Sequence, residues 1–231
     1  MARDPFEWYP TPASYTRALW QWSAVGPDDV IIEPCVGDGA ILNVLRALGW
    51  RGRAVTNDLD ARWPADEHRD ATSAETWRVL LARAEALRAV APAHARILVV
   101  TNPPFSAAAR ILACAMSPVV PPQPFVFSTT LLLRLTFLEP TEDRVELLNR
   151  LPDPSLYVMP RFSFQRAEID GKWRHDSVTV AWMHWRRGDY ESVVRVANVD
   201  VIQACQDERP AFRARVDAIM ATRAPQQEDS V

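Results

Sequence analysis

The stretch Ile97-Leu98-Val99-Val100-Thr101-Asn102-Pro103-Pro104-Phe105 joins an apolar run of strand character to a rigid turn. The strand must end at this turn, because two successive prolines fix φ and remove two backbone donors. Asn102, which precedes a proline, is pushed toward extended geometry. The stretch therefore predicts a stiff loop with one amide side chain, free carbonyls and an aromatic ring. It lies at the carboxyl end of a strand, where open α/β sheets bind ligands.

The exocyclic amine of adenine is a group that suits this loop. That amine is a poor nucleophile, because its lone pair is delocalised into the ring. The side-chain oxygen of Asn102 and the carbonyl of Pro103 can accept its two N–H bonds and polarise it, while Phe105 stacks on the base. Fixed acceptors and placement then supply the catalysis without a metal or a covalent nucleophile. A plain Pro-Pro strand terminator is the alternative for these residues alone.

Length and composition favour one globular domain. The chain has 231 residues, of which 48% are hydrophobic, and a formal net charge of −3, which neither advertises nor excludes nucleic-acid binding. No apolar run approaches the roughly 20 residues of a membrane span, and the N-terminal residues lack the apolar core of a signal peptide. Cys35, Cys114 and Cys205 are scattered and form no C-x-x-C pattern. We therefore expect reduced thiols in a cytoplasmic protein, with no metal site and no membrane contact.

A second strand-to-turn junction lies nearer the N-terminus. Val30-Ile31-Ile32 runs into Glu33-Pro34-Cys35-Val36-Gly37-Asp38-Gly39, and a helix follows. Gly37 and Gly39 allow positive φ and a close approach of a ligand to the backbone. The third glycine of the dinucleotide fingerprint is absent. The acid at the strand end, Glu33, suits a cationic or hydroxyl-bearing ligand better than a phosphate, although a plain βα turn is the alternative.

Two more acids follow expected strands. Asp58 comes after the strand Ala54–Asn57, about 20 residues beyond the glycines, where nucleotide-binding α/β folds hydrogen-bond a ribose. An ordinary solvated loop carboxylate is the alternative for Asp58. Residues 69–71 are expected to form a third short strand with Asp70 at its end.

Strands and helices alternate along most of the chain. Helices are expected near residues 13–24, 40–48, 74–90, 107–116 and 142–151, and further strands near 125–130, 156–159 and 177–185. After Gly188 only a helix over 211–222 is expected. This alternation predicts a three-layer α/β domain with a parallel sheet.

Basic and aromatic side chains interleave over residues 161–187. The stretch holds six basic residues against three acidic ones, and Phe162, Phe164 and Trp173 lie between them. Basic groups with aromatics suit a strand of unstacked bases. An edge hairpin with an amphipathic surface is the alternative.

Together these motifs resemble those of class I S-adenosylmethionine-dependent amino methyltransferases. Residues 33–39 match the family's E-P-x-x-G-x-G cofactor loop, and residues 102–105 match its [DNS]-P-P-[YFW] catalytic motif. The chain order, with Tyr9-Pro10-Thr11-Pro12 ahead of both, is similar to the gamma arrangement of adenine-N6 DNA methyltransferases. Residues 132–138 and 160–164 resemble small phage and prophage enzymes. The resemblance implies a Rossmann-like class I methyltransferase fold, with a mostly parallel seven-stranded sheet and an antiparallel last strand.

The resemblance also implies S-adenosylmethionine as the cofactor and assigns residues to it. Thr11 would meet the methionine carboxylate, and Glu33 would hold the methionine portion. Asp58 would accept the ribose hydroxyls, and Asp70 would bind the adenine amine. The full set of implied cofactor-binding residues is Tyr9, Thr11, Pro12, Glu33, Pro34, Gly37, Asp38, Gly39, Asp58, Leu59, Asp70 and Ala71.

The implied reaction is methyl transfer to the N6 amine of adenine in DNA. Asn102, Pro103, Pro104 and Phe105 would form the catalytic loop. Phe162 or Phe164 would be a second stacking partner for the base, and Arg161 and Lys172 would join them in binding DNA. RNA adenine and protein glutamine methyltransferases use the same motif and are the alternative. A non-catalytic subunit of the same fold would be free to lose Gly37, Asp58 or Asn102, and all three are present.

Residues 1–188 are expected to form the catalytic domain, residues 189–222 an extension packed on it, and residues 223–231 a disordered tail. Only about 45 residues follow the last expected strand, too few for the separate target-recognition domain of large gamma enzymes. Sequence recognition would then come from loops such as 161–175, from a homodimer or from a partner. A duplex target requires base flipping at a cost of a few kcal/mol, which a single strand largely avoids.

Overall fold

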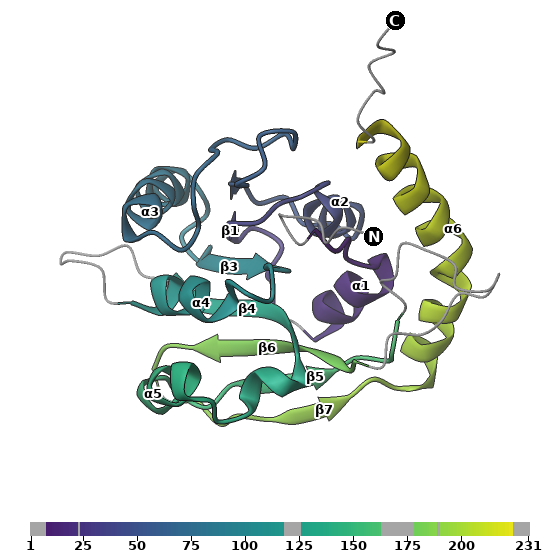
Figure 1. Cartoon of the computed structure of the whole chain (residues 1–231). Coiled ribbons are helices and arrows are strands. Elements are labelled where there is room, and N and C mark those ends of the chain that lie inside the picture. Colours follow the sequence, from purple (N-terminus) through teal and green to yellow (C-terminus); the bar gives the residue numbers. More distant parts are fainter. Residues whose placement is uncertain (1–7, 23, 118–125, 163–177, 189, 224–231) are drawn as a thin grey trace, which may run out of the picture.

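The computed structural model describes residues 8–22, 24–117, 126–162, 178–188 and 190–223 (Figure 1). They form a seven-stranded sheet with the order β2-β1-β3-β4-β6-β5-β7. The strands are β1 (Val30–Glu33), β2 (Ala54–Thr56), β3 (Ile97–Thr101), β4 (Val126–Arg134), β5 (Ser155–Val158), β6 (Val180–Arg186) and β7 (Val194–Val196). The helices are α1 (Ala13–Gln21), α2 (Ala40–Ala47), α3 (Ala74–Ala89), α4 (Ala108–Met116), α5 (Glu142–Arg150) and α6 (Val199–Arg223), and a short 3-10 helix covers Leu135–Leu138.

Four neighbouring strands on one side of the sheet, β2, β1, β3 and β4, are parallel. β1 pairs in parallel with β2 and β3, and β3 pairs in parallel with β4. β6 runs antiparallel to both of its neighbours, β4 and β5, whereas β7 pairs in parallel with β5. The expected three-layer, mostly parallel Rossmann-like fold is thus confirmed. The antiparallel strand is the one expected near residues 177–185, but β7 follows it in the chain and forms the edge of the sheet.

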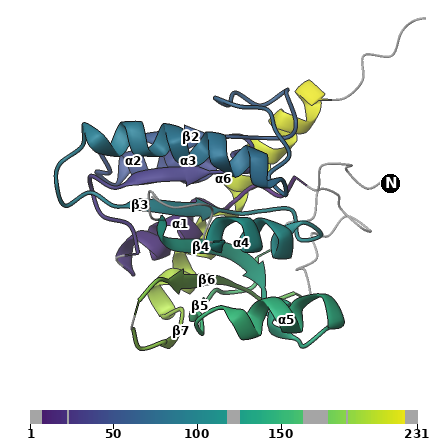
Figure 2. The same cartoon turned by 90° about the vertical axis from the view of Figure 1, so that its left-hand side faces the viewer.

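Helices cover both faces of the sheet because its central strands are apolar on both sides. Ile31 and Leu98 pack in a cluster with residues of α1, α2 and α6. Their neighbours Ile32 and Val99 pack in a second cluster with residues of α3 and α4. Figure 2 shows α4 and α5 in front of the sheet, with α1 and α6 behind it. The three layers follow directly from the continuous apolar runs in β1 and β3.

The expected third strand at residues 69–71 is wrong. This segment is a turn that leads into α3, and the described residues between β2 and α3 make only an isolated bridge, between Asn57 and Glu67. The buried Asn57 side chain donates to the carbonyls of Pro34 and Arg69, and its oxygen accepts from the Arg69 amide. A side chain therefore takes the backbone bonds that a neighbouring strand would take. The seventh strand is β7 instead.

The C-terminal helix α6 begins at Val199, twelve residues before the start expected from the sequence. Its buried residues Val201, Cys205, Phe212 and Val216 pack in the cluster that also contains α1. Figure 1 shows α6 along the right-hand edge of the molecule, beside α1. The expected tail at 223–231 lies outside the described residues except for Arg223.

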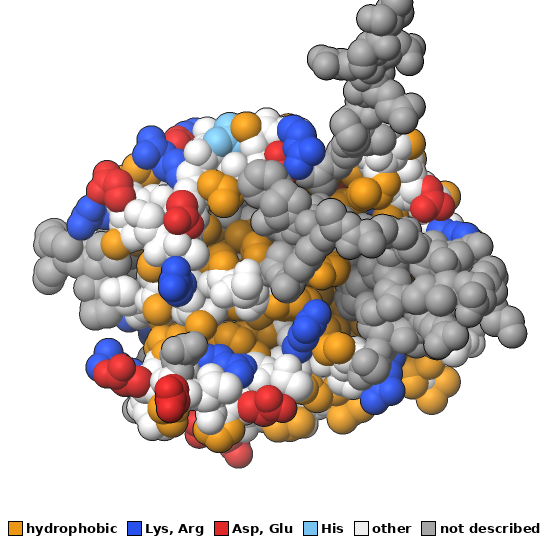
Figure 3. Space-filling view, viewed as in Figure 1, with side chains coloured by type: hydrophobic (Ala, Val, Ile, Leu, Met, Phe, Trp, Pro, Cys, Tyr) orange, Lys and Arg blue, Asp and Glu red, His pale blue; other side chains and the backbone are white. Residues whose placement is uncertain are grey.

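Charged and apolar side chains separate on the face seen in Figure 3. Lys, Arg, Asp and Glu side chains lie mainly around the rim of this face, and apolar side chains gather toward its centre. Within the described ranges, no helix is long and apolar enough to cross a bilayer.

Candidate active site

A cavity opens at the carboxyl ends of β1, β2 and β3. It encloses about 970 Å³ of empty space, its open mouth included. Four separate segments form its wall: the residues before α1, the turn between β1 and α2, the loop after β2 and the loop after β3. A cleft of this size at the ends of parallel strands is typical of a site for a nucleotide-sized ligand.

Most of the residues that the sequence assigns to a cofactor lie in this wall. They are Tyr9, Thr11, Glu33, Pro34, Gly37, Asp38, Asp58, Leu59, Asp70 and Ala71. Asn102 and Pro104 of the expected catalytic loop line the same cavity. The lining does not include Pro12, Gly39, Pro103 or Phe105, which lie beside lining residues in the sequence. The fold thus gathers motifs that lie almost 100 residues apart in the chain.

The turn between β1 and α2 has the conformation expected of its glycines. Gly37 has a φ of 52° and Gly39 a φ of 72°. A Cβ atom on Gly37 would lie 3.1 Å from Nε1 of Trp8, so there is no spare room beside this position. The Gly37 amide donates a 2.8 Å hydrogen bond to Oδ2 of Asp58, which ties the turn to the end of β2.

Glu33 is a buried acid that faces the cavity. The residue is only 1% exposed, and its Oε2 atom has no hydrogen-bond partner among the described residues. Burial, together with the nearby carboxylates of Asp38 and Asp58, raises the pKa of Glu33 well above its usual value. A buried acceptor without a partner is costly, so it indicates a ligand that brings a hydrogen-bond donor, preferably a cationic one.

Two further carboxylates are held with acceptor capacity to spare. Asp58 accepts one backbone N–H on each oxygen, from Gly37 and from Asp60. Burial raises the pKa of Asp58, and these two amides oppose the shift. Asp70 accepts the Thr72 amide and hydroxyl on the single atom Oδ1, and these bonds lower its pKa. Each carboxylate is therefore fixed in place but can still accept from a ligand.

The Asn102 amide is oriented by the segment before α1. Its Nδ2 donates to the carbonyl of Tyr9 at 2.8 Å and to the hydroxyl of Thr11 at 3.2 Å. A backbone carbonyl can only accept, so the nitrogen must face Tyr9 and the oxygen must face away. Among the described residues, none donates to Oδ1. The amide is thus held as a free acceptor at the end of β3.

The ring of Phe105, in the loop after β3, contacts two groups. It stacks on Tyr9, with centroids 5.6 Å apart and an angle of 23° between the planes. The guanidinium carbon of Arg134 lies 4.5 Å from the ring centroid. Arg134 was not predicted from the sequence, because only the pairing of β3 with β4 brings the end of β4 close to Phe105.

Two tryptophans in the cavity wall were also missed. Trp8 and Trp63 have ring centroids 5.2 Å apart and come from different segments, one before α1 and one in the loop after β2. A lone aromatic within the polar segment 60–68 is the signal that could have identified Trp63.

Two of the predicted substrate residues, Arg161 and Phe162, do not line the cavity. Arg161 is exposed after β5, and its Nε donates to the Thr179 hydroxyl at 3.4 Å. Phe162 is 2% exposed and packs edge-on against Tyr15 and Phe212, so its place in the core does not fit the expected stacking role. Phe164 and Lys172 lie outside the described residues. Within the described part, no cluster of three or more His, Cys, Asp or Glu could hold a metal ion.

No protein-family model and no curated protein matches the chain. Solved structures with similarity to it include a 23S rRNA methyltransferase, ErmE, with 12% identity, a TM-score of 0.43 and coverage of 95% of this chain and 81% of the other. A type I restriction-modification methyltransferase subunit from Streptococcus thermophilus has 12% identity and a TM-score of 0.44, with coverage of 91% of this chain and 55% of the other. A protein described as a modification subunit of a type I restriction enzyme, from Vibrio vulnificus, has 10% identity, a TM-score of 0.42 and coverage of 88% and 53%. The chain spans about half the length of these two restriction-system subunits.

Replacing Glu33 by Gln is expected to stabilise the ligand-free protein at neutral and alkaline pH. When a carboxyl group has a higher pKa in the folded than in the unfolded state, the protein loses stability as the pH rises. The loss begins near the pKa of the unfolded state, 4.5, and continues up to the pKa of the folded state. Gln removes this loss. We expect a Tm at pH 8 higher by roughly 2–4 °C, which corresponds to about 1 kcal/mol in a domain of this size.

Asp58→Asn is the matched control for this measurement. It also removes a cavity carboxylate, but one that accepts a backbone N–H on each oxygen, and an amide has only one accepting oxygen. Its Tm should therefore fall. Superimposable curves of Tm against pH for Glu33→Gln and the wild type would contradict the interpretation of Glu33 as a strained, unpartnered acid.

Proposed function

We propose that this protein transfers a methyl group from S-adenosylmethionine to the N6 amine of adenine in DNA. The observation that carries the proposal is the orientation of Asn102. Its nitrogen is held by Tyr9 and Thr11, and its oxygen is left as a free acceptor beside a cavity lined with carboxylates. This is the arrangement that an amino methyltransferase of the Asn-Pro-Pro-aromatic type needs.

The wall of the cavity fits the proposed cofactor. The unpartnered Oε2 of Glu33 suits the ammonium group of its methionine portion. The spare acceptor positions of Asp58 suit ribose hydroxyls, and those of Asp70 suit the adenine amine. Leu59, which is 58% exposed and lines the cavity, offers an apolar surface to the adenine ring. When bound, S-adenosylmethionine supplies an electrophilic methyl group on a sulfonium.

The residues at the end of β3 prepare the amine. The Asn102 Oδ1 atom and the Pro103 carbonyl accept its two N–H bonds and draw the lone pair out of the ring. Because the Asn102 oxygen is held in place before the substrate arrives, little reorganisation of this acceptor is needed when the amine begins to carry positive charge. Phe105 holds the base by stacking once the ring contact with Tyr9 or Arg134 is exchanged for the base.

Two arginines support a nucleic acid as the substrate. Arg134 is half-buried against Phe105, and the described residues place no acid within ion-pair distance of it. Arg161 lies near Arg134, because Thr179 contacts the segments that contain both arginines. The Thr179 carbonyl accepts from the amide of Leu135, which follows Arg134, and the Thr179 hydroxyl accepts from Arg161. Cations that have no acidic partner in the described part of the chain suit the phosphates that flank a target base. We also propose that residues 1–188 form the catalytic domain, to which residues 190–222 contribute the edge strand β7 and the helix α6.

The first test is methyl transfer from radiolabelled S-adenosylmethionine to duplex DNA, single-stranded DNA, RNA and a protein extract. We expect N6-methyladenine in digested DNA. Asn102→Ala should lower the rate by about 10²–10³-fold, the range seen when one fixed group that stabilises a transition state is removed. Cofactor affinity, measured by calorimetry, should change far less.

Asn102→Asp serves as the companion variant, because it keeps the acceptor oxygen while losing the two donated bonds to Tyr9 and Thr11. It should retain more activity than Asn102→Ala. Label in RNA or protein alone would move the function to an RNA adenine or protein glutamine methyltransferase. Undiminished activity of Asn102→Ala would refute the catalytic role.

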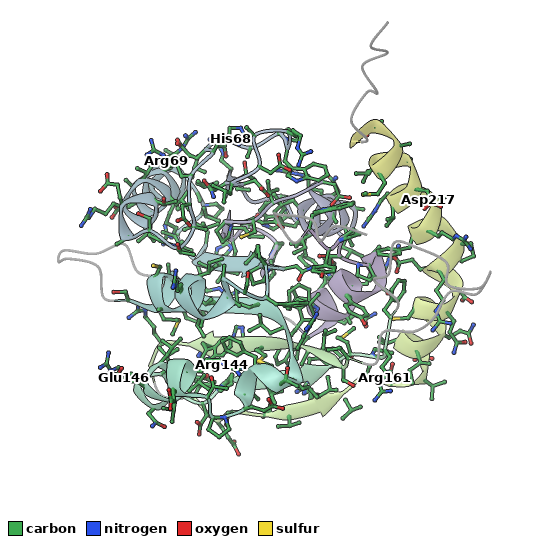
Figure 4. All side chains as sticks on the ribbon, viewed as in Figure 1. His68, Arg69, Arg144, Glu146, Arg161 and Asp217 are labelled. Carbon is green, nitrogen blue, oxygen red and sulfur yellow. The ribbon has the colours of Figure 1, made fainter. Side chains whose placement is uncertain are left out.

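A second test concerns the two arginines. Arg134→Ala and Arg161→Ala should each weaken DNA binding and reduce the slope of log affinity against log salt by about 1, the value for one lost phosphate contact. Arg150→Ala is the control, because Arg150 is exposed on α5 and already paired with Glu146. Figure 4 shows Glu146 and Arg161 on opposite sides of the view. Equal salt slopes for all three variants would exclude this phosphate contact.

A further inference from the structure

The C-terminal helix α6 caps the first helix of the chain. The first amides of a helix have no partner within the helix, and the residue before α1 is Pro12, which makes no side-chain cap. The Glu208 carboxylate supplies the missing acceptors: one oxygen accepts from the Ala13 amide, and the other accepts from the Ser14 amide at 2.6 Å. A carboxylate is also the favoured charge at a helix N-terminus. Cys205, one turn earlier in α6, donates to the Ser14 hydroxyl at 3.2 Å.

Arg215, two turns beyond Glu208, reaches the segments that build the cavity. Its Nη2 donates to the carbonyl of Thr11 at 3.0 Å. Its Nε lies 3.4 Å from Oδ2 of Asp38. Thr11 and Asp38 both line the cavity, whereas Arg215 does not. One guanidinium outside the cavity thus joins two separate segments of its wall.

Thr11 is consequently held from two directions. Its carbonyl accepts from Arg215 on α6, and its hydroxyl accepts from Asn102 at the end of β3. Asp38 depends on the same arginine: burial raises the pKa of the Asp38 carboxyl, and the Arg215 charge opposes that shift. Without Arg215, both the backbone of Thr11 and the ionised form of Asp38 lose support.

We propose that Arg215 is a positioning residue for cofactor binding, which holds Thr11 and Asp38 in the arrangement that accepts S-adenosylmethionine. The proposal rests on the proposed function, because it assigns the cavity to that cofactor. The C-terminal helix is then a part of the cofactor site, although none of its residues lines the cavity.

The test compares three variants of the full chain. Arg215→Ala removes both contacts, and Arg215→Lys keeps one cationic donor. Arg213→Ala is the matched control on the same helix, because Arg213 is 44% exposed and lies 3.9 Å from Asp217 one turn along α6. Figure 4 shows Asp217 on the upper part of α6. For each protein, calorimetry gives the affinity for S-adenosylmethionine and for DNA, thermal unfolding gives the ligand-free Tm, and hydrogen exchange reports on residues 11–16.

We expect Arg215→Ala to weaken cofactor binding about tenfold, as suits the loss of a charge-assisted hydrogen bond. Its KM for the cofactor should rise while kcat at saturating cofactor stays within a few-fold. Arg215→Lys should recover part of the affinity, and Arg213→Ala should match the wild type. Faster exchange of the Ala13 to Thr16 amides is expected in Arg215→Ala without cofactor.

An unchanged cofactor affinity in Arg215→Ala would overturn the proposal. The proposal would also be overturned if Arg215→Ala lowered cofactor affinity, DNA affinity and the ligand-free Tm to a similar extent, because that pattern indicates a purely structural role. If the wild type itself does not bind S-adenosylmethionine, the proposed function fails. Hydrogen exchange would then still show whether Arg215 holds the segment before α1, so the two failures can be told apart.

Discussion

The register between the buried parallel strands β1 and β3 is the constraint on which the site depends. Ile32 pairs with Val99, so the strand ends that follow, at Glu33 and Asn102, emerge side by side. Both strands are buried on both faces, and a slip of one residue would turn the side chains of the slipped strand toward the opposite helical layers. Core packing therefore sets the position of the loop after β3, which contains Asn102, relative to the acidic turn.

The cavity has a cost in stability that a ligand with hydrogen-bond donors would offset. Glu33 is buried with an oxygen that lacks a partner, and the carboxylates of Asp38 and Asp58 stand near it. The side-chain oxygen of Asn102 is also left as a free acceptor, because the amide nitrogen already donates to Tyr9 and Thr11. Sites prepared in this manner bind strongly because their acceptors are already in place when the ligand arrives.

Local sequence predicted the parts of the site that depend on local chemistry. The strand-to-turn junctions at Glu33 and Asn102 could be found because glycines, prolines and apolar runs act over a few residues. The strand expected at residues 69–71 was wrong because the Asn57 side chain satisfies that backbone instead. Phe162 could not be placed in the core from sequence, since the surface that buries it includes Phe212 of α6, a helix that was only partly expected.

The contact between α6 and α1 has a consequence for the order in which the protein matures. Glu208 and Arg215 secure residues 11–14, which leave the ribosome almost two hundred residues earlier. During synthesis the central strands can pair well before α6 exists, but the first helix stays uncapped until the last part of the chain emerges. A nascent chain therefore carries the acidic turn and the loop after β3 in an incomplete pocket, and the wall of this pocket is complete only when residues 11–14 and α6 meet.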